Sequence, residues 1–350
     1  MEYGFLSPSC GLKVSKVALG TMTFGGGAMP GQCDEPAAHA ILDAYAAAGG
    51  NFIDTADVYS GGESERIVGR WLQTVARDTF VIATKLRFQS GAAGDPNAVG
   101  LSRKHVRLAV EASLARLQTP YVDLLQLHCW DAGTPVEETV RALAELVGAG
   151  KVMYVGASNV TGWQLQKLVM CCRAHGVPLA TLQAQYSLLC RQTEWELQPC
   201  AAAEGIGLLP WSPLKGGWLA GKVRRGGAPA AGTRVGWAQA TKPGLQSAPD
   251  YDALAGDERT WALLDGMAEI AARRGGKSVA QVALRWLMQR EAVASVVIGA
   301  KTLEQLHDNL GATTWELADA DVAQLDALSD VPVPYPWEMV GRCQGGRTRQ

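Results

Sequence analysis

The sequence lacks a strong excess of charge of either sign. Its 350 residues include 32 lysines and arginines against 34 aspartates and glutamates, which gives a formal net charge of −2. Basic residues are scattered, with only short pairs such as Arg224-Arg225 and Arg273-Arg274. Nucleic-acid-binding domains usually carry a basic patch or stripe. The composition therefore argues against nucleic acid as a partner.

The chain also lacks an apolar run of the roughly 20 residues needed to cross a bilayer. Its longest uncharged stretches, 17–33 and 174–190, contain Gly, Pro and Gln and are typical of strands with loops. The first residues, MEYGFLSPSCG, have no basic segment followed by an apolar one, so they do not resemble a secretory signal. We therefore expect a cytoplasmic protein without a membrane segment.

Eight cysteines occur, but none forms a CxxC pair, and Cys171 and Cys172 are adjacent on a predicted helix. This pattern indicates reduced thiols in a cytosolic protein, not a disulfide framework. No pair of histidines has the spacing of metal ligands, so we expect no metal site.

Several catalytic signatures are missing as well. The segment GTMTFGGG, which begins at Gly20, does not match the GxGxxG turn of dinucleotide-binding sheets. The segment GGKS at 275–278 lacks the first glycine of a phosphate-binding loop, because Ala271 stands there. No Ser or Cys lies in a nucleophile elbow, so acyl transfer is poorly supported.

What the sequence does contain is a regular alternation of short apolar runs with longer amphipathic segments. The runs are continuously hydrophobic, as expected for parallel strands that are covered on both faces. Eight such units predict a closed (β/α)8 TIM barrel, with a doubly wound sheet as the alternative. The predicted strands are 17–20, 51–54, 80–84, 122–127, 152–157, 179–183, 206–210 and 295–298.

Two regions depart from this alternation. A long segment rich in Gly, Ala and Pro, 214–256, follows the seventh strand, and loops of that length are usually functional or disordered. The sequence VPVPYPW at 331–337 begins a stretch that we expect to be irregular. We therefore predict one barrel domain over 1–330 and an irregular C-terminal tail over 331–350.

Four titratable residues fall at or just after the ends of predicted strands two, three and four: Asp54, Tyr59, Lys85 and His128. Taken singly, each has an ordinary structural explanation. A barrel, however, gathers these strand ends at one mouth, where catalytic residues of the fold lie. Tyrosine, with an ordinary pKa of about 10, holds its proton at neutral pH and can act as a general acid.

The other three residues can assist that proton transfer. A nearby Lys85 ammonium should lower the pKa of Tyr59, and Asp54 should keep Lys85 charged and oriented. His128 can donate a hydrogen bond to a carbonyl oxygen.

The ordered motifs of the chain resemble those of the aldo-keto reductase superfamily over roughly residues 1–330. The resemblance implies an N-terminal β-hairpin before the barrel, and Asp54, Tyr59, Lys85 and His128 as a catalytic tetrad with Tyr59 as proton donor. The motifs are LSPSCGLKVSKVALGTMTFGG, FIDTADVYSGGESERIVG, SPLKGGWLAGK and IGAKTLEQLHDNLGA.

By the same resemblance, residues from several strand ends and from the long loop would bind a nicotinamide dinucleotide, with Trp211 stacked on its ring. The expected cofactor-binding residues are Gly20, Thr21, Met22, Asp54, Ser158, Asn159, Gln183, Trp211, Ser212, Pro213, Leu214, Gly217, Lys222, Arg234, Gly299, Lys301, Gln305, Asp308 and Asn309. The expected substrate-pocket residues are Met22, Phe24, Tyr59, His128 and Trp130.

The resemblance favours NADP(H) as the cofactor, because Lys301 follows strand eight where a 2′-phosphate would bind. Gln305 stands where some relatives have Arg, so use of NAD(H) stays open. The leading function is reduction of aldehydes and ketones to alcohols by hydride transfer, with a small carbonyl compound as substrate.

The branch of the superfamily that this chain resembles includes β subunits of potassium channels, whose pattern is similar to PVEETVRALAELVGAGKVMYVGAS. A cofactor-bound regulatory subunit is therefore the alternative function. A Schiff-base aldolase that uses Lys85 is weaker, since it would not explain the cofactor segments. The sequence identifies neither the substrate nor the oligomeric state, and a homo-oligomer stays open.

Overall fold

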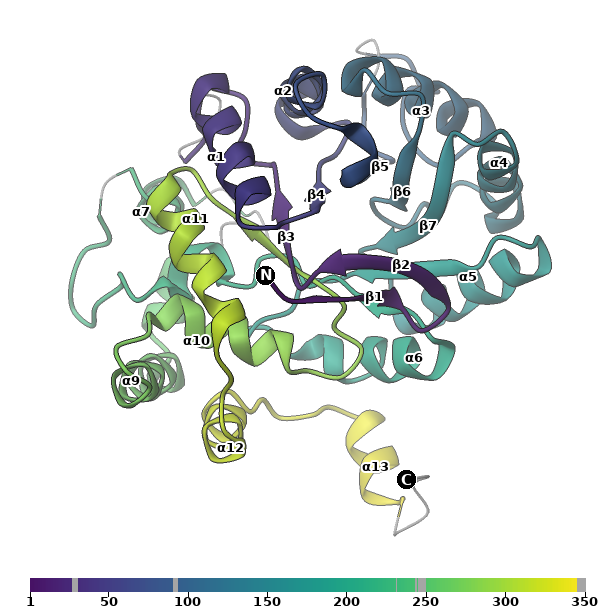
Figure 1. Cartoon of the computed structure of the whole chain (residues 1–350). Helices are drawn as coiled ribbons and strands as arrows, with labels where there is room; N and C mark the ends of the chain where they lie inside the picture. Colours follow the sequence, from purple (N-terminus) through teal and green to yellow (C-terminus); the bar gives the residue numbers. More distant parts are fainter. Residues whose placement is uncertain (27–30, 91–93, 231, 243, 245–249, 345–350) are drawn as a thin grey trace.

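The computed structural model describes residues 1–26, 31–90, 94–230, 232–242, 244 and 250–344. Within these residues, eight parallel strands run in the order β10-β3-β4-β5-β6-β7-β8-β9, with helices around the outside (Figure 1). The strands are β3 (Val17–Gly20), β4 (Phe52–Asp54), β5 (Val81–Leu86), β6 (Val122–Leu127), β7 (Val152–Ser158), β8 (Leu179–Gln183), β9 (Gly207–Leu208) and β10 (Val296–Gly299).

The two ends of this sheet meet and close it into a barrel. The backbone N–H of Leu208, in β9, donates to the carbonyl of Ala292 at 2.7 Å. The N–H of Ala294, just before β10, donates to the carbonyl of Leu208 at 2.9 Å. The predicted TIM barrel is therefore confirmed.

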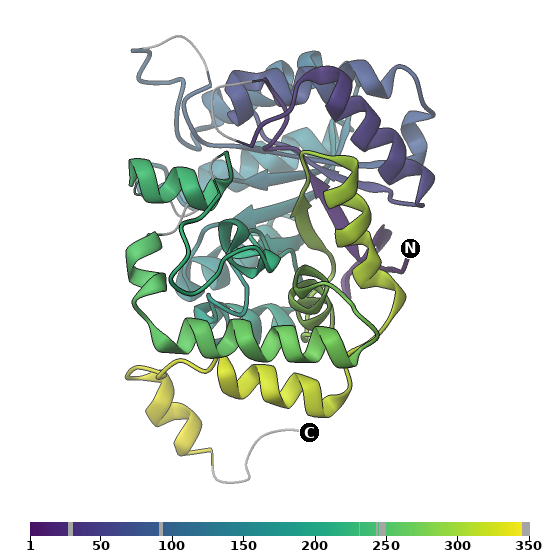
Figure 2. The same cartoon turned by 90° about the vertical axis from the view of Figure 1, so that its left-hand side faces the viewer.

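Helices cover the outer face of the barrel, and Figure 2 shows them from a second side. Helix α9 packs against both α10 and α12. The helices are α1 (Glu35–Ala47), α2 (Glu63–Leu72), α3 (Arg103–Leu117), α4 (Val136–Gly148), α5 (Gly162–Ala174), α6 (Leu197–Glu204), α7 (Arg234–Thr241), α8 (Tyr251–Ala255), α9 (Glu258–Arg273), α10 (Val279–Met288), α11 (Leu303–Leu310), α12 (Asp319–Leu328) and α13 (Trp337–Arg342).

Several of these helices begin where the sequence supplies a side chain that caps the first turn. Asp34 accepts a hydrogen bond from the N–H of Ala37 at the start of α1. Ser102 caps α3 and Thr302 caps α11 in the same way. Each cap satisfies a backbone N–H that the helix itself leaves unpaired, which typically contributes about 1 kcal/mol.

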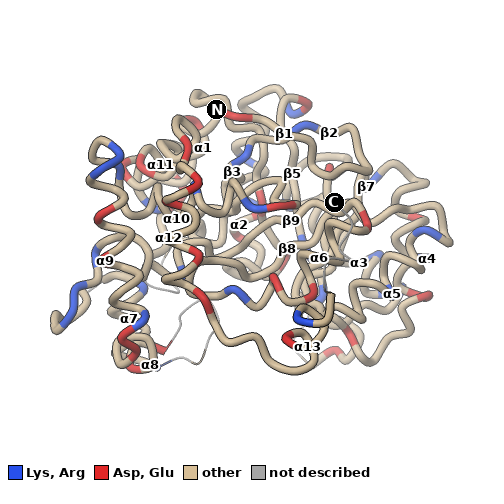
Figure 3. Tube along the Cα trace, turned by 90° about the horizontal axis from the view of Figure 1, so that it is seen from below, with Lys and Arg blue, Asp and Glu red and all other residues tan. Residues whose placement is uncertain are grey.

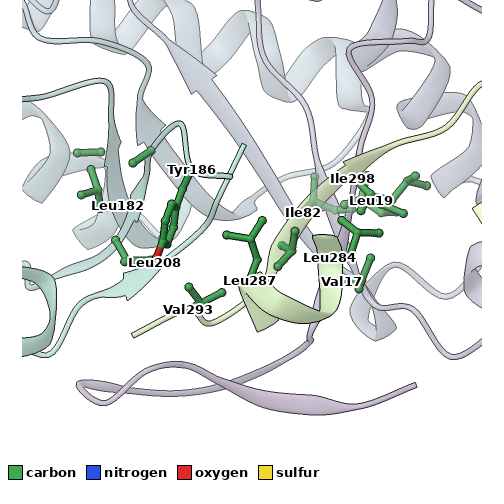
Figure 4. Close-up of a cluster of buried hydrophobic side chains, with 14 of the residues drawn as sticks. Val17, Leu19, Ile82, Leu182, Tyr186, Leu208, Leu284, Leu287, Val293 and Ile298 are labelled. Atoms are coloured by element: carbon green, nitrogen blue, oxygen red, sulfur yellow. The ribbon is translucent and has the colours of Figure 1, made fainter. Parts of the chain in front are cut away.

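Side chains alternate between two cores along the strands. Val17 and Leu19 point outward and pack with Leu284 and Leu287 of α10 in a large cluster between barrel and helices (Figure 4). Ala18 lies between them in sequence and points to the barrel interior. This period of two follows from strand geometry, and burial on both faces explains why the strands are continuously apolar.

The expected N-terminal hairpin is present as β1 (Tyr3–Ser7) and β2 (Cys10–Ser15). Its residues Leu6 and Val14 complete the inner core, so the hairpin closes the bottom of the barrel. Contact with β9 is direct, since a Cβ added at Gly207 would lie 1.8 Å from the carbonyl oxygen of Leu6. The opposite end of the barrel, at the C-terminal ends of the strands, contains the candidate active site.

The long segment 214–256 is partly helical in its described residues, where it contains the 3-10 segment η4 (Lys215–Ala220), α7 and α8. Residues 231, 243 and 245–249 of this segment lie outside the described residues. Figure 3 shows acidic and basic residues mixed along most elements, in keeping with the near-neutral charge.

The expectation of a wholly irregular tail over 331–350 is wrong for Trp337–Arg342, which form α13. The prolines of VPVPYPW end at Pro336, and the residues after it are free to become helical. The Trp337 ring lies 5.6 Å from that of Trp195, which holds the tail against the barrel. Residues 345–350 lie outside the described residues, and the boundary at 330 stays a prediction.

Candidate active site

A cavity of about 600 Å³ opens at the C-terminal ends of the strands. Its wall brings together nearly all of the residues that the sequence predicted for the cofactor and the catalytic centre. Those on the wall are Gly20, Met22, Asp54, Tyr59, His128, Ser158, Asn159, Gln183, Trp211, Ser212, Pro213, Leu214, Gly217, Lys222, Arg234, Gly299, Lys301, Gln305, Asp308 and Asn309.

Four predicted site residues do not line this cavity. Lys85 is fully buried beneath it. Thr21 is also buried, and its hydroxyl pairs with that of Ser64 at 2.7 Å. Phe24 is part of the hydrophobic core, and Trp130 packs edge-on against Trp163 at 5.5 Å, beside the mouth. The structure therefore gives Phe24 and Trp130 packing contacts in place of the predicted positions in the pocket wall.

The Lys85 ammonium is the centre of the site. Its Nζ donates to Asp54 Oδ2 at 2.6 Å, to the carbonyl of Thr55 at 2.8 Å and to the Tyr59 hydroxyl at 3.0 Å. Burial alone would lower the pKa of Lys85. Asp54 and Tyr59 together raise this pKa by more than burial lowers it, so the net shift is upward. A lysine with three acceptors for its three N–H groups stays charged and fixed.

Both oxygens of the Asp54 carboxylate accept hydrogen bonds. While Oδ2 accepts from Lys85, Oδ1 accepts from Gln126 Nε2 at 3.0 Å and from Gln183 Nε2 at 2.9 Å. Gln126 was not among the predicted site residues. The signal for it in the sequence is a polar amide inside the apolar strand VDLLQL.

Tyr59 lies in a sharp turn between β4 and α2. Ser60, Gly61 and Gly62 all have positive φ angles, of 51°, 63° and 88°. Glycine adopts such angles at no steric cost, which explains the glycine-broken loop after Tyr59. The turn returns the chain into α2 and leaves the phenol beside Lys85.

The pKa of Tyr59 differs in direction from the expectation. Its hydroxyl is surrounded by protein although the residue is partly exposed to the cavity, and this burial raises the pKa. The Lys85 ammonium lowers it, as expected, but by less than burial raises it. The phenol therefore keeps its proton at neutral pH, which suits a proton donor.

His128 follows β6 and faces Tyr59 across the cavity. Burial, and next the Lys85 charge, lower the pKa of His128 to about 3, so the imidazole is neutral over the physiological range. Its ring packs edge-on against Tyr59 at 5.9 Å and against Phe88 at 4.8 Å. Phe88, at the mouth after β5, lines the cavity and was not predicted.

Another part of the cavity wall presents polar groups that lack a partner. Among the described residues, the buried Trp211 Nε1 and Ser212 Oγ have no hydrogen-bond partner. Arg234, the first residue of α7, has no carboxylate partner among the described residues, and burial lowers its pKa. Unpaired buried polar groups are costly, so this wall is built to receive a polar, anionic ligand.

A second cation stands at the start of α11. Lys301 Nζ contacts the carbonyl of Gly232 at 3.4 Å and has no ion pair among the described residues. Its backbone N–H donates to Gln305 Oε1 at 3.0 Å. Asp308, in contrast, already accepts from Ser278 at 3.0 Å and Gln281 at 2.9 Å.

Comparison with known proteins agrees with this arrangement. The model of the aldo/keto reductase family matches residues 16–330. The chain belongs to the aldo/keto reductase family. The likeness to channel β subunits stays a prediction, because the relatives described next are named as reductases and a dehydrogenase.

Three curated relatives cover almost the whole chain. Norsolorinic acid reductase A of Aspergillus parasiticus is 34% identical over 95% of this chain and 82% of its own length. Aldo-keto reductase ausK of Aspergillus calidoustus is 32% identical over 97% of this chain and 85% of its own. The aryl-alcohol dehydrogenase [NADP(+)] of Phanerodontia chrysosporium is 31% identical over 96% of this chain and 88% of its own length. This member of the family is therefore an oxidoreductase.

Two kinds of feature are absent from the described residues. No three His, Cys, Asp or Glu side chains gather there in a way that could hold a metal ion. No helix among those residues has both the length and the apolar character that a bilayer span requires. All eight cysteines are free.

Proposed function

We propose that this aldo/keto reductase reduces an aldehyde or ketone to the alcohol with NADPH, and that Tyr59 donates the proton. The observation that carries the proposal is the buried contact of Lys85 with both Asp54 and Tyr59 below an open cavity. A protonated phenol beside a fixed ammonium is suited to give up a proton to an alkoxide, because the ammonium stabilises the phenolate that remains.

Each member of the tetrad has a separate task in this mechanism. The bound nicotinamide would supply the hydride to the carbonyl carbon. Tyr59 donates its proton to the carbonyl oxygen, and Lys85 stabilises the resulting phenolate. Neutral His128 can donate an N–H to the same oxygen and orient it. Asp54 holds Lys85 in place.

The residues of the cavity wall fit a nicotinamide dinucleotide. Ser158, Asn159 and Gln183 would bind the carboxamide, and Trp211 would stack against the ring. The unpaired Ser212 hydroxyl and the Arg234 guanidinium would contact the pyrophosphate, whose negative charge would pair with that guanidinium. The rest of the predicted set would surround the remainder of the dinucleotide.

The proposed preference for NADPH over NADH rests on Lys301. Its ammonium lacks a carboxylate partner in the described structure and stands at a helix N-terminus, where anions are favoured. One of the relatives is named as an NADP(+) enzyme. Gln305 offers no second positive charge, so NAD(H) would be used less well, not excluded.

The substrate is proposed to be a small carbonyl compound with an aromatic group. Phe88 and Met22 give the mouth of the cavity an apolar wall beside His128. The relatives include an aryl-alcohol dehydrogenase and a norsolorinic acid reductase. The free cysteines agree with the proposed cytoplasmic location.

The complete tetrad favours turnover over a purely regulatory, channel-subunit role.

The test is a panel of aromatic and aliphatic aldehydes, ketones and quinones, followed by NADPH absorbance. We expect turnover with at least one aromatic carbonyl, and its loss in Tyr59→Phe. A protein that binds NADPH and reduces none of the panel would support the regulatory alternative.

A further inference from the structure

A buried amide outside the tetrad contacts its carboxylate. Gln126 is fully buried in β6, between Leu125 and Leu127. It does not line the cavity. Its Nε2 donates to Asp54 Oδ1 at 3.0 Å, and its Oε1 lies 3.5 Å from Gln183 Nε2. Placing an amide in a barrel core is costly unless it is hydrogen-bonded, so the contact with Asp54 explains its presence.

The barrel makes room for this side chain at the level of the tetrad. Gln126 is the direct cross-strand partner of Lys85 on β5 and of Gly156 on β7. A Cβ added at Gly156 would lie 3.2 Å from Gln126 Cγ and 2.2 Å from Thr181 Oγ1. A larger residue at 156 would therefore crowd the amide that reaches Asp54.

The two amides that hold Asp54 Oδ1 are not equivalent. Gln183 faces the cavity and, by the proposed function, binds the cofactor carboxamide. When Gln183 is drawn to that ligand, Gln126 is the donor that stays on Oδ1. The other oxygen, Oδ2, bonds Lys85 at 2.6 Å, so rotation of the carboxylate would shift the ammonium relative to Tyr59.

We propose that Gln126 is a positioning residue of the proton-transfer site. Its amide fixes the Asp54 carboxylate so that Asp54 keeps Lys85 against the Tyr59 hydroxyl. This inference rests on the proposed function. It adds to the tetrad a fifth residue that touches neither the cofactor nor the substrate.

The main test compares Gln126→Met, an apolar change of similar length, with the parent enzyme in single-turnover hydride transfer. The rate should fall about 10–100-fold, the value of one hydrogen bond to a charged group. The dissociation constant of NADPH should stay within about twofold, because Gln126 does not line the cavity. Thr181→Val is the matched control, since Thr181 is buried on β8 and its hydroxyl has no partner among the described residues.

A second readout separates positioning from a general effect on stability. If Lys85 loosens, it lowers the pKa of Tyr59 less, and the pH profile of alcohol oxidation should move to higher pH. The double variant with Asp54→Asn should be no slower than Asp54→Asn alone, since both changes act through one carboxylate. Gln126→Glu, which keeps length and polarity, should lose more activity than Gln126→Met, because an acceptor then faces Asp54.

Parent-like rates and pH profiles in Gln126→Met and Gln126→Glu would overturn the inference. Equal losses in Gln126→Met and Thr181→Val, with no shift of the pH profile, would overturn it as well. The proposed function is judged separately by Tyr59→Phe. If Tyr59→Phe is inactive while Gln126→Met keeps the parent rate and the parent pH profile, only the role of Gln126 fails.

Discussion

Asp57 lies in the turn between β4 and Tyr59 and is only 2% exposed. Its backbone N–H donates to the carbonyl of Lys85 at 3.0 Å. Burial, and next the Glu65 carboxylate, raise the pKa of Asp57 from 3.8 to about 7, although a hydrogen bond from Ser90 and the Arg116 charge oppose the rise. Arg116 is already bonded to Glu65 at 2.6 Å. The ionised form of Asp57 therefore destabilises the folded protein relative to the protonated form.

The sign of the effect on stability follows from proton binding. The folded protein holds the Asp57 proton more tightly than the unfolded chain does, so stability falls as the pH rises from about 4 through about 7. Since a tenfold difference in proton affinity is about 1.4 kcal/mol, the full loss is about 4 kcal/mol. Asp57→Asn keeps the shape of the side chain and removes this loss.

The assay is urea unfolding of the parent and Asp57→Asn at pH 5 and pH 8. The stabilisation by Asn should be larger at pH 8 than at pH 5 by about 2–3 kcal/mol. Asp330→Asn, at an exposed aspartate, controls for the loss of one negative charge. A stabilisation that is equal at the two pH values, or a loss of stability at pH 8, would refute the reasoning.

Two further predictions concern the cavity wall. Lys301→Ala should weaken NADPH binding by about 10–100-fold, the value of a charge-assisted contact, and leave NADH binding nearly unchanged, as titrated by Trp211 fluorescence; an unaltered preference would contradict the role of Lys301. Cys129→Ser should keep most of the turnover, because Cys129 is a wall residue whose thiol contacts the Asn159 carbonyl at 3.6 Å; a thousandfold loss with an unchanged melting temperature would show that the mechanism is incomplete.

The barrel could be predicted because its strands have a simple chemical signature. The bounds of β3, β6 and β8 agree with the predicted ranges to the residue. Both faces of these strands are buried, so a continuous apolar run ends where the rim begins. That is also why Asp54, Lys85 and His128 could be placed near one another before any coordinates.

Other features depend on tertiary contacts that no local pattern contains. Gln126 looks like an interruption of an apolar strand until its neighbour Asp54 is known. The direction of the pKa shift of Tyr59 depends on how much burial outweighs Lys85. Phe24 and Trp130 follow strands just as wall residues do, yet the course of their loops turns them into packing contacts.

The central claim is that Tyr59, held against Lys85, donates the proton. The most direct measurement is single-turnover hydride transfer from NADPH to the best carbonyl substrate in Tyr59→Phe. This change keeps the ring and removes the hydroxyl that Lys85 contacts at 3.0 Å. We predict a rate about 10²–10⁴-fold below the parent, with NADPH binding retained and no further loss on adding Lys85→Met. A Tyr59→Phe protein that transfers hydride at the parent rate would contradict the account.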